Sequence, residues 1–228
     1  MARKLADIRH LDTEALARKK TLVEQAYETI RYRIITTAYS PGAELNEAQV
    51  SLDTGFGRTP INQALHRLEQ ERFVDIRPRK GAWVRPISPD EIAEIIEVRL
   101  LLEPYSTAQA AASVKQDKLE EPRRILKRAQ EELDNQARTE VLMQLDGAFH
   151  SWINWISGNR ALSETLKQFQ DRSARFWFHS LSNPDHARQV HEEHKCIFQA
   201  ICARDREESF EAAKSHIKSF RSVILNYV

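Results

Sequence analysis

Four side chains in the second half of the chain have the types and spacing of a metal site. Asp146 and His150 are four residues apart in LDGAFHSWI, so a helix would place a carboxylate and an imidazole on one face. His194 and His216 lie in two later helical segments and align with apolar residues, which predicts that both point inward. One oxygen and three nitrogens suit zinc, nickel, cobalt or manganese and leave positions for water or a ligand. The pattern indicates a divalent metal site, with ordinary buried core histidines as the alternative.

An arginine interrupts the apolar stripe of the first helical segment of this region. Arg99 shares that stripe with Ile92, Ile95 and Leu102. A buried guanidinium needs an anionic partner, and two kinds of partner fit. One is the carboxylate of a bound effector, held in the bidentate geometry that arginine favours, and the other is an internal acid such as Glu103. The sequence leaves both open.

The elements that must position these side chains are helices. After residue 89, helical patterns follow one another, broken by polar and glycine-containing or proline-containing segments such as residues 157–159 and 182–185. The expected helices cover residues 90–113, 116–136, 139–157, 160–181, 188–203 and 207–227. Strand signals are absent from this part of the sequence. We therefore predict an antiparallel bundle of six or seven helices.

The first half carries a different pattern, two short helices followed by a small basic hairpin. A helix is expected over residues 47–53, Gly55 permits a tight turn, and Thr59-Pro60 opens a second helix. The polar face of that second helix would carry Arg58, Thr59, Asn62, Gln63 and His66. Such groups meet base edges and phosphates when a helix enters the major groove. This order predicts a winged helix-turn-helix.

Charge divides the chain in the same way. Residues 1–85 hold 15 Lys/Arg and 11 Asp/Glu, whereas residues 86–228 hold 19 and 22. The 228 residues, 41% hydrophobic, are long enough for two modest domains. We expect a mainly α protein with an N-terminal arm at 1–20, a DNA-binding domain at 21–85, a proline-flanked linker at 86–89, and a helical effector-binding and dimerisation domain at 90–228.

Composition also excludes several classes of protein. No stretch approaches the roughly 20 apolar residues of a membrane span, and the charged N-terminus lacks the apolar core of a signal peptide. We expect a cytoplasmic protein without a membrane partner. Cys196 and Cys202 are six residues apart, which fits neither a disulfide framework nor a CxxC metal site, so both are predicted to be buried thiols.

Taken in order, these motifs resemble the GntR family of bacterial transcription factors, specifically the FadR subfamily with the helical effector domain called FCD. The resemblance covers residues 21–228. It rests on PGAELNEAQV, GFGRTPINQALHRLE, RPRKGAWV, EVRLLLEP, DGAFH, SGNRAL, EEHKCIFQAI and the terminal SHI. It implies that Asp146, His150, His194 and His216 hold a divalent metal, with zinc the first candidate, and that Arg99 binds the effector.

The resemblance is less close at the positions that read DNA. It places Arg58 and Thr59 at the start of the recognition helix and Gly81 at the wing tip, where a missing side chain allows close approach to the minor groove. Ala48 and Asn62 occupy positions that are commonly arginine in the family. Arginine favours guanine and asparagine favours adenine, so the operator is expected to depart from the family's usual bases. A solvated polar position is the alternative for Asn62.

The sequence therefore predicts a ligand-responsive transcriptional regulator rather than an enzyme. It would be a repressor that binds a palindromic operator as a homodimer. It would leave the operator when a small organic acid binds at the metal. One alternative is a regulator with a purely structural metal. Another is a metal-dependent enzyme acting on small organic acids, with Glu192 or Glu193 as its base, but that hypothesis leaves the N-terminal module unexplained.

Overall fold

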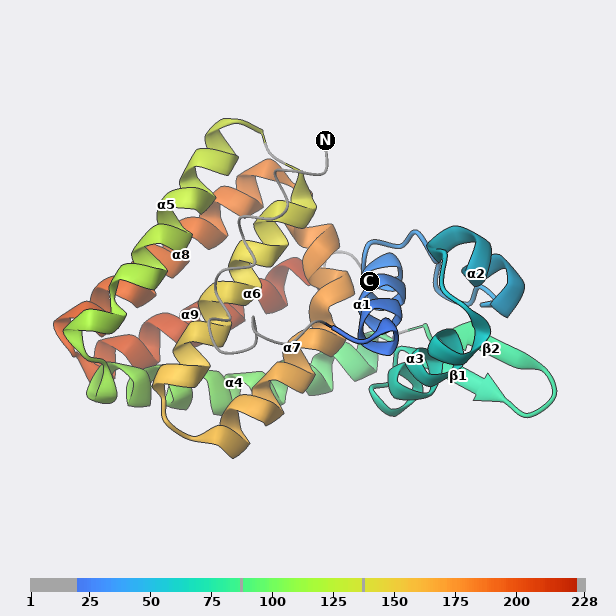
Figure 1. The fold of residues 1–228 in the computed structure, drawn as a ribbon. Coiled ribbons are helices and arrows are strands. Elements are labelled where there is room, and N and C mark those ends of the chain that lie inside the picture. Colours follow the sequence, from blue (N-terminus) through green and yellow to red (C-terminus); the bar gives the residue numbers. More distant parts are fainter. Residues whose placement is uncertain (1–19, 87, 137, 225–228) are drawn as a thin grey trace. The chain divides into compact units, whose positions relative to one another are not determined.

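The computed structural model of the protein describes residues 20–86, 88–136 and 138–224. Of the segments expected above, residues 1–19 of the N-terminal arm, residue 87 of the linker and residues 225–228 lie outside the described part. The chain divides into two compact units, Met1–Pro86 and Ile87–Val228 (Figure 1).

The N-terminal unit is a winged helix-turn-helix. It contains α1 (Leu22–Ile35), α2 (Glu47–Thr54), α3 (Arg58–Gln70), β1 (Val74–Arg77) and β2 (Gly81–Val84). The strands are antiparallel, with Val74 opposite Val84 and Arg77 opposite Gly81. The recognition helix α3 packs on α1 through a fully buried apolar core that includes Ile30, Ile34, Ile61 and Leu68.

Local sequence explains how the helix-turn-helix is formed. The Asn46 side chain accepts hydrogen bonds from the Ala48 and Gln49 amides and so caps α2. Gly55 ends α2 with a φ of 76°, in the left-handed region that favours glycine. α3 begins at Arg58, one residue before the expected Thr59-Pro60 opening, and Pro60 lies in the first turn, where no intrahelical amide is needed.

Sequence analysis did not predict α1 as a separate helix, although its start is marked. Thr21 and Glu24 form a reciprocal capping box in which each side chain accepts a hydrogen bond from the other residue's amide. The helix matters for function because its buried face supports the recognition helix.

The C-terminal unit is a helical bundle, so the mainly α fold is confirmed. Its described helices are α4 (Pro89–Ser113), α5 (Glu120–Asp134), α6 (Thr139–Ile156), α7 (Arg160–Leu181), α8 (Pro184–Ala203) and α9 (Arg206–Ile224), with a short 3₁₀ helix η3 (Gln116–Lys118) before α5. α4 packs most extensively on α9 and also contacts α6, α7 and α8 (Figure 1). An apolar cluster that includes Ile92, Ile95, Ile96, Trp177 and Phe220 joins α4, α7 and α9.

Two expectations in this unit were wrong in detail. The helix expected from residue 188 begins at Pro184, because Asn183 caps it and accepts hydrogen bonds from the Asp185 and His186 amides. Cys196 is exposed rather than buried, and Cys202 is half-buried. None of the described helices has both the length and the apolar character needed to cross a membrane.

Candidate metal centre and DNA-binding groove

The three histidines predicted to bind metal meet inside the bundle. His150 comes from α6, His194 from α8 and His216 from α9, and one ligand nitrogen of each lies within 4.8 Å of the others. Asp146 Oδ1 lies 3.9 Å from His150 Nε2 and 3.5 Å from His194 Nε2. All three imidazoles are buried, and the Asp146 side chain is only 12% exposed. Folding therefore brings together four potential ligands from three helices.

The four ligand atoms have no hydrogen-bond partner within the described residues. They are Asp146 Oδ1, His150 Nε2, His194 Nε2 and His216 Nε2. Buried polar atoms are nearly always paired, because an unpaired one forfeits its interaction with water. Three imidazole nitrogens in one cluster, with a carboxylate oxygen beside two of them, are a donor set that a divalent transition metal takes. The residues present therefore fit a metal.

Two acidic side chains lie beside the outward-facing nitrogens of these imidazoles. Glu193 Oε2 lies 2.7 Å from His216 Nδ1, and Glu103 Oε2 lies 3.6 Å from His150 Nδ1. The Glu193 contact is a hydrogen bond that holds the proton on His216 Nδ1 and leaves the Nε2 lone pair free, as is usual behind metal-bound histidines. The Glu103 contact is too long for a hydrogen bond and acts on His150 through its charge. Sequence reasoning named Glu103 only as a partner for Arg99 and Glu193 only as a possible base, and missed this role.

Burial sets the protonation of the cluster. Desolvation lowers the pKa of His150 to about 3, with His216 and Arg99 adding to the effect and Glu103 opposing it. Desolvation likewise lowers the pKa of His194 well below its usual value. Burial raises the pKa of Asp146 to about 7, against the lowering effects of His216 and Arg99. Both histidines are neutral near pH 7, the form in which imidazole binds a metal.

Arg99 is buried and already has an internal partner. Its Nε donates to Glu103 Oε1 at 2.5 Å, and an Nη donates to Ser173 Oγ at 3.2 Å. Burial would raise the pKa of Glu103, but Arg99 and then His150 outweigh it, so the pKa lies below its usual value. The internal acid, one of the two partners left open by the sequence, is thus paired with Arg99. The role of Arg99 toward an effector stays a prediction.

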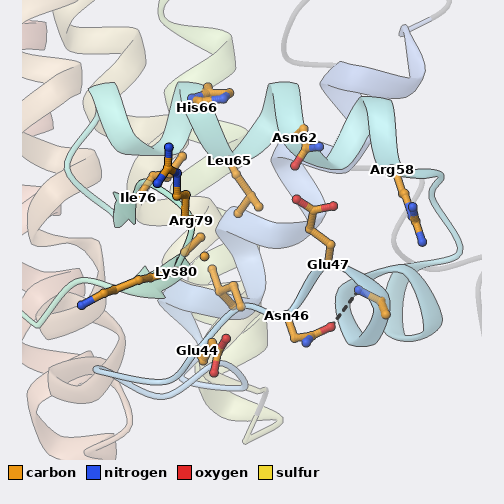
Figure 2. Close-up of a pocket in the computed structure, with 14 residues that line it drawn as sticks. Glu44, Asn46, Glu47, Arg58, Asn62, Leu65, His66, Ile76, Arg79 and Lys80 are labelled. Atoms are coloured by element: carbon orange, nitrogen blue, oxygen red, sulfur yellow. Dashed lines mark hydrogen bonds between the residues drawn. The ribbon is translucent and has the colours of Figure 1, made fainter.

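A groove in the N-terminal unit brings together part of the predicted DNA-contacting set. It has a volume of about 640 Å³ and is bordered by the start of α2, by α3 and by the wing (Figure 2). Arg58, Asn62 and Gly81 line it, whereas Thr59 and Gln63 are exposed on α3 but do not line it. Gly81 has a φ of 114°, a conformation that favours glycine.

The groove also contains charged residues that sequence reasoning did not single out. They are Glu44, Glu47, Arg79 and Lys80. The two cations, Arg79 and Lys80, follow β1 in the tight turn of the wing. The basic RPRK segment of the sequence could therefore have indicated them. No sequence pattern marked the two acids.

Comparison with known proteins identifies the family. Residues 22–84 match the family described as "Bacterial regulatory proteins, gntR family", and residues 94–219 match the FCD domain. The chain belongs to the GntR family. This GntR regulator is 23% identical over 193 residues to the uncharacterized regulator YdhC of Bacillus subtilis, covering 85% of this chain and 84% of YdhC. It is 22% identical over 195 residues to the transcriptional repressor RspR of Escherichia coli, covering 86% and 85%.

The solved structures agree on the fold. That of E. coli McbR/YncC matches 92% of this chain and 99% of its own, with a TM-score of 0.81 and 20% identity. The two family matches make the protein a DNA-binding transcriptional regulator with an FCD domain.

The buried ion pair leads to a test by a double-mutant cycle. Replacing Arg99 with Met leaves the Glu103 carboxylate buried without its main counter-charge, and we expect the free energy of unfolding to fall by about 3–5 kcal/mol. Adding Glu103→Gln to Arg99→Met should recover part of that loss, as measured by urea unfolding.

The matched control is Arg160→Met, which breaks an exposed pair with Glu164 on α7 and should leave the unfolding free energy nearly unchanged. Equal losses from Arg99→Met and Arg160→Met would show that the buried pair does not hold the bundle.

Proposed function

We propose that this regulator is a repressor, released from its operator when a small carboxylic acid binds at a divalent metal in the bundle. The observation that carries the proposal is the convergence of ligand nitrogens from His150, His194 and His216, with Asp146 Oδ1 3.9 Å and 3.5 Å from the first two. Among the described residues, none of these ligand atoms has a hydrogen-bond partner. A metal that takes more than four ligands would bind all four side chains and keep positions for a further oxygen donor, whereas these side chains would fill a tetrahedral zinc site. The repressor name of RspR supports the direction of control.

Each residue has a defined task in this proposal. The three imidazoles and Asp146 would hold the metal, with Glu193 and Glu103 orienting His216 and His150. When bound, the metal supplies a Lewis-acidic centre that a carboxylate oxygen of the effector can coordinate. Arg99 and Glu103 are paired in this structure. To stabilise the effector's remaining charge, Arg99 would have to bind the effector and Glu103 together or break its ion pair with Glu103.

α4 offers a route from this centre toward the DNA-binding unit. It is 25 residues long, carries both Arg99 and Glu103, and begins at Pro89, three residues after the N-terminal unit ends. The Glu103 carboxylate lies next to His150 Nδ1, so a change at the metal would alter a contact made by α4. We propose that the effector shifts α4 and so changes the spacing of two winged units on a palindromic operator.

A structural metal is the second candidate, and one observation favours it. The cavity that adjoins Asp146, His191 and His194 has a volume of only about 30 Å³, about one water molecule. Apolar side chains such as Leu145 and Val190 make up most of its lining. An effector larger than water therefore requires the bundle to open there, whereas a structural metal requires no such change.

A second copy of this chain is the partner that we propose for the bundle. Leu101 and Tyr105, one turn apart on α4, are 73% and 49% exposed, and Trp155 on α6 is 59% exposed. A hydrogen bond between the Ser106 and Asn154 side chains places the two helix surfaces side by side. We propose that these three residues belong to one apolar patch, because exposed apolar side chains of this kind mark interfaces.

Metal binding is tested by titrating zinc into the metal-free protein. Zinc at about 100 times its dissociation constant should add about 2.7 kcal/mol of stability, seen as a higher Tm. His150→Ala and His194→Ala should each weaken binding strongly, as measured by calorimetry.

The control for the zinc titration is His186→Ala. His186 is equally buried and unpaired among the described residues, but it lies outside the cluster. Equal zinc binding by all three variants and the wild type would contradict the site.

Control by an acid is tested on operator DNA obtained by selecting bound fragments from the source genome. Fluorescence anisotropy would then follow release of the zinc-loaded protein by a panel of mono-, di- and tricarboxylic acids. We expect one acid class to weaken DNA binding on the order of 100-fold, equivalent to about 3 kcal/mol of coupling, and only with metal present. Operator binding that no acid alters, in a protein that binds zinc, would favour the structural metal.

The dimer is tested by placing a charge in the apolar patch. Leu101→Asp and Trp155→Asp should each convert the dimer to a monomer and weaken operator binding, because a buried unpaired carboxylate opposes association. Light scattering coupled to gel filtration gives the mass in solution. Leu52→Asp, at an 81% exposed leucine of α2, is the matched control and should leave the mass unchanged. A dimer that persists in both patch variants would place the interface elsewhere.

A further inference from the structure

The charges in the DNA-binding groove are arranged with a carboxylate between cations. Figure 2 shows Glu47 extending from the start of α2 toward Asn62 on α3, with Arg58 to one side and Arg79 and Lys80 to the other. Cations at such a surface meet phosphates. An acid there is repelled by the same phosphates, so it needs a specific reason to face the DNA.

Among the described residues, no other side chain holds the Glu47 carboxylate in its position. It is exposed, and within the described part of the chain it forms neither a hydrogen bond nor an ion pair. The helix start is already capped by Asn46, whose side chain accepts from the Ala48 and Gln49 amides. The next residue, Ala48, has no side chain long enough to cover the Glu47 carboxylate. The carboxylate is therefore free to meet a ligand in the groove.

The second acid of the groove is placed differently. Glu44 forms an isolated β-bridge with Trp83, and its Oε1 lies 3.5 Å from where a Cβ on Gly81 would be. Its carboxylate thus lies against the wing rather than beside the recognition helix. This difference makes Glu44 a matched control, with the same charge in the same groove.

Base chemistry gives Glu47 a definite preference. In the major groove, cytosine presents the N4 amino donor, while guanine presents only the acceptors O6 and N7. A carboxylate accepts from cytosine and is repelled by guanine. The neighbouring Asn62 side chain can donate to N7 and accept from N6 of adenine. Both preferences differ from those of an arginine, which selects guanine.

We propose that Glu47 is a specificity-determining residue that selects cytosine and rejects guanine at one position of each operator half-site, next to an adenine read by Asn62. The inference rests on DNA binding, which family membership establishes, and is independent of the metal and the effector. The negative charge of Glu47 thereby weakens binding to DNA in general while it increases the discrimination between bases.

The test is operator selection from a random DNA library with the purified full-length protein, followed by anisotropy titrations with all four bases at each half-site position. Wild type should disfavour guanine at one position by about tenfold to a hundredfold. In Glu47→Ala and Glu47→Gln that penalty should disappear, and binding to random DNA should tighten because one negative charge is lost. Asn62→Ala should remove the adenine preference at the adjacent position.

The control variant separates readout from simple charge. Glu44→Gln should also tighten binding to all DNA but leave every base preference as in the wild type. Unchanged base preferences in Glu47→Ala and Glu47→Gln, with melting curves showing that both are folded, would overturn the proposal. Glu47 would then only stabilise the start of α2 through the helix dipole.

Discussion

The bundle is organised around the cost of burying a cluster of three histidines with an aspartate beside two of them. In the described part of the chain, Asp146 Oδ1 and the Nε2 atoms of the three histidines are buried without a hydrogen-bond partner, and each such atom carries a penalty that the surrounding packing must offset. The opposite sides of two imidazoles face Glu193 and Glu103, and Glu103 in turn pairs with Arg99. The buried polar side chains of the bundle are thus connected to one another. Through this connection, the Glu103 carboxylate on α4 lies next to His150 on α6.

The parts of this arrangement that follow helical periodicity could be predicted from the sequence. Asp146 and His150 had to share a face because they are four residues apart on one helix, and His194 and His216 lie on apolar stripes that had to turn inward. The winged helix-turn-helix was equally legible, because Gly55 and Pro60 restrict the backbone at its turn and at its second helix.

The parts that depend on how helices meet could not be predicted. A stripe shows that Arg99 is buried but not which acid reaches it, and an effector carboxylate fitted as well as Glu103. Glu193 precedes His194 in sequence but faces His216 of another helix, a pairing that only the packing of α8 on α9 creates. The position of Glu47 in the groove and the exposure of Cys196 are likewise tertiary facts. Each depends on the rotation of a helix about its own axis. The pattern of apolar residues in the sequence does not define that rotation precisely enough.

The distribution of the four ligands along the chain also affects how the protein folds. Asp146 and His150 lie within one helical turn of each other, but His194 and His216 follow 44 and 66 residues after His150. Local structure can form early, whereas contacts between distant segments require loops to close first. The cluster therefore cannot form before α6, α8 and α9 have docked, so its four side chains lose their water only when these distant segments of the chain meet.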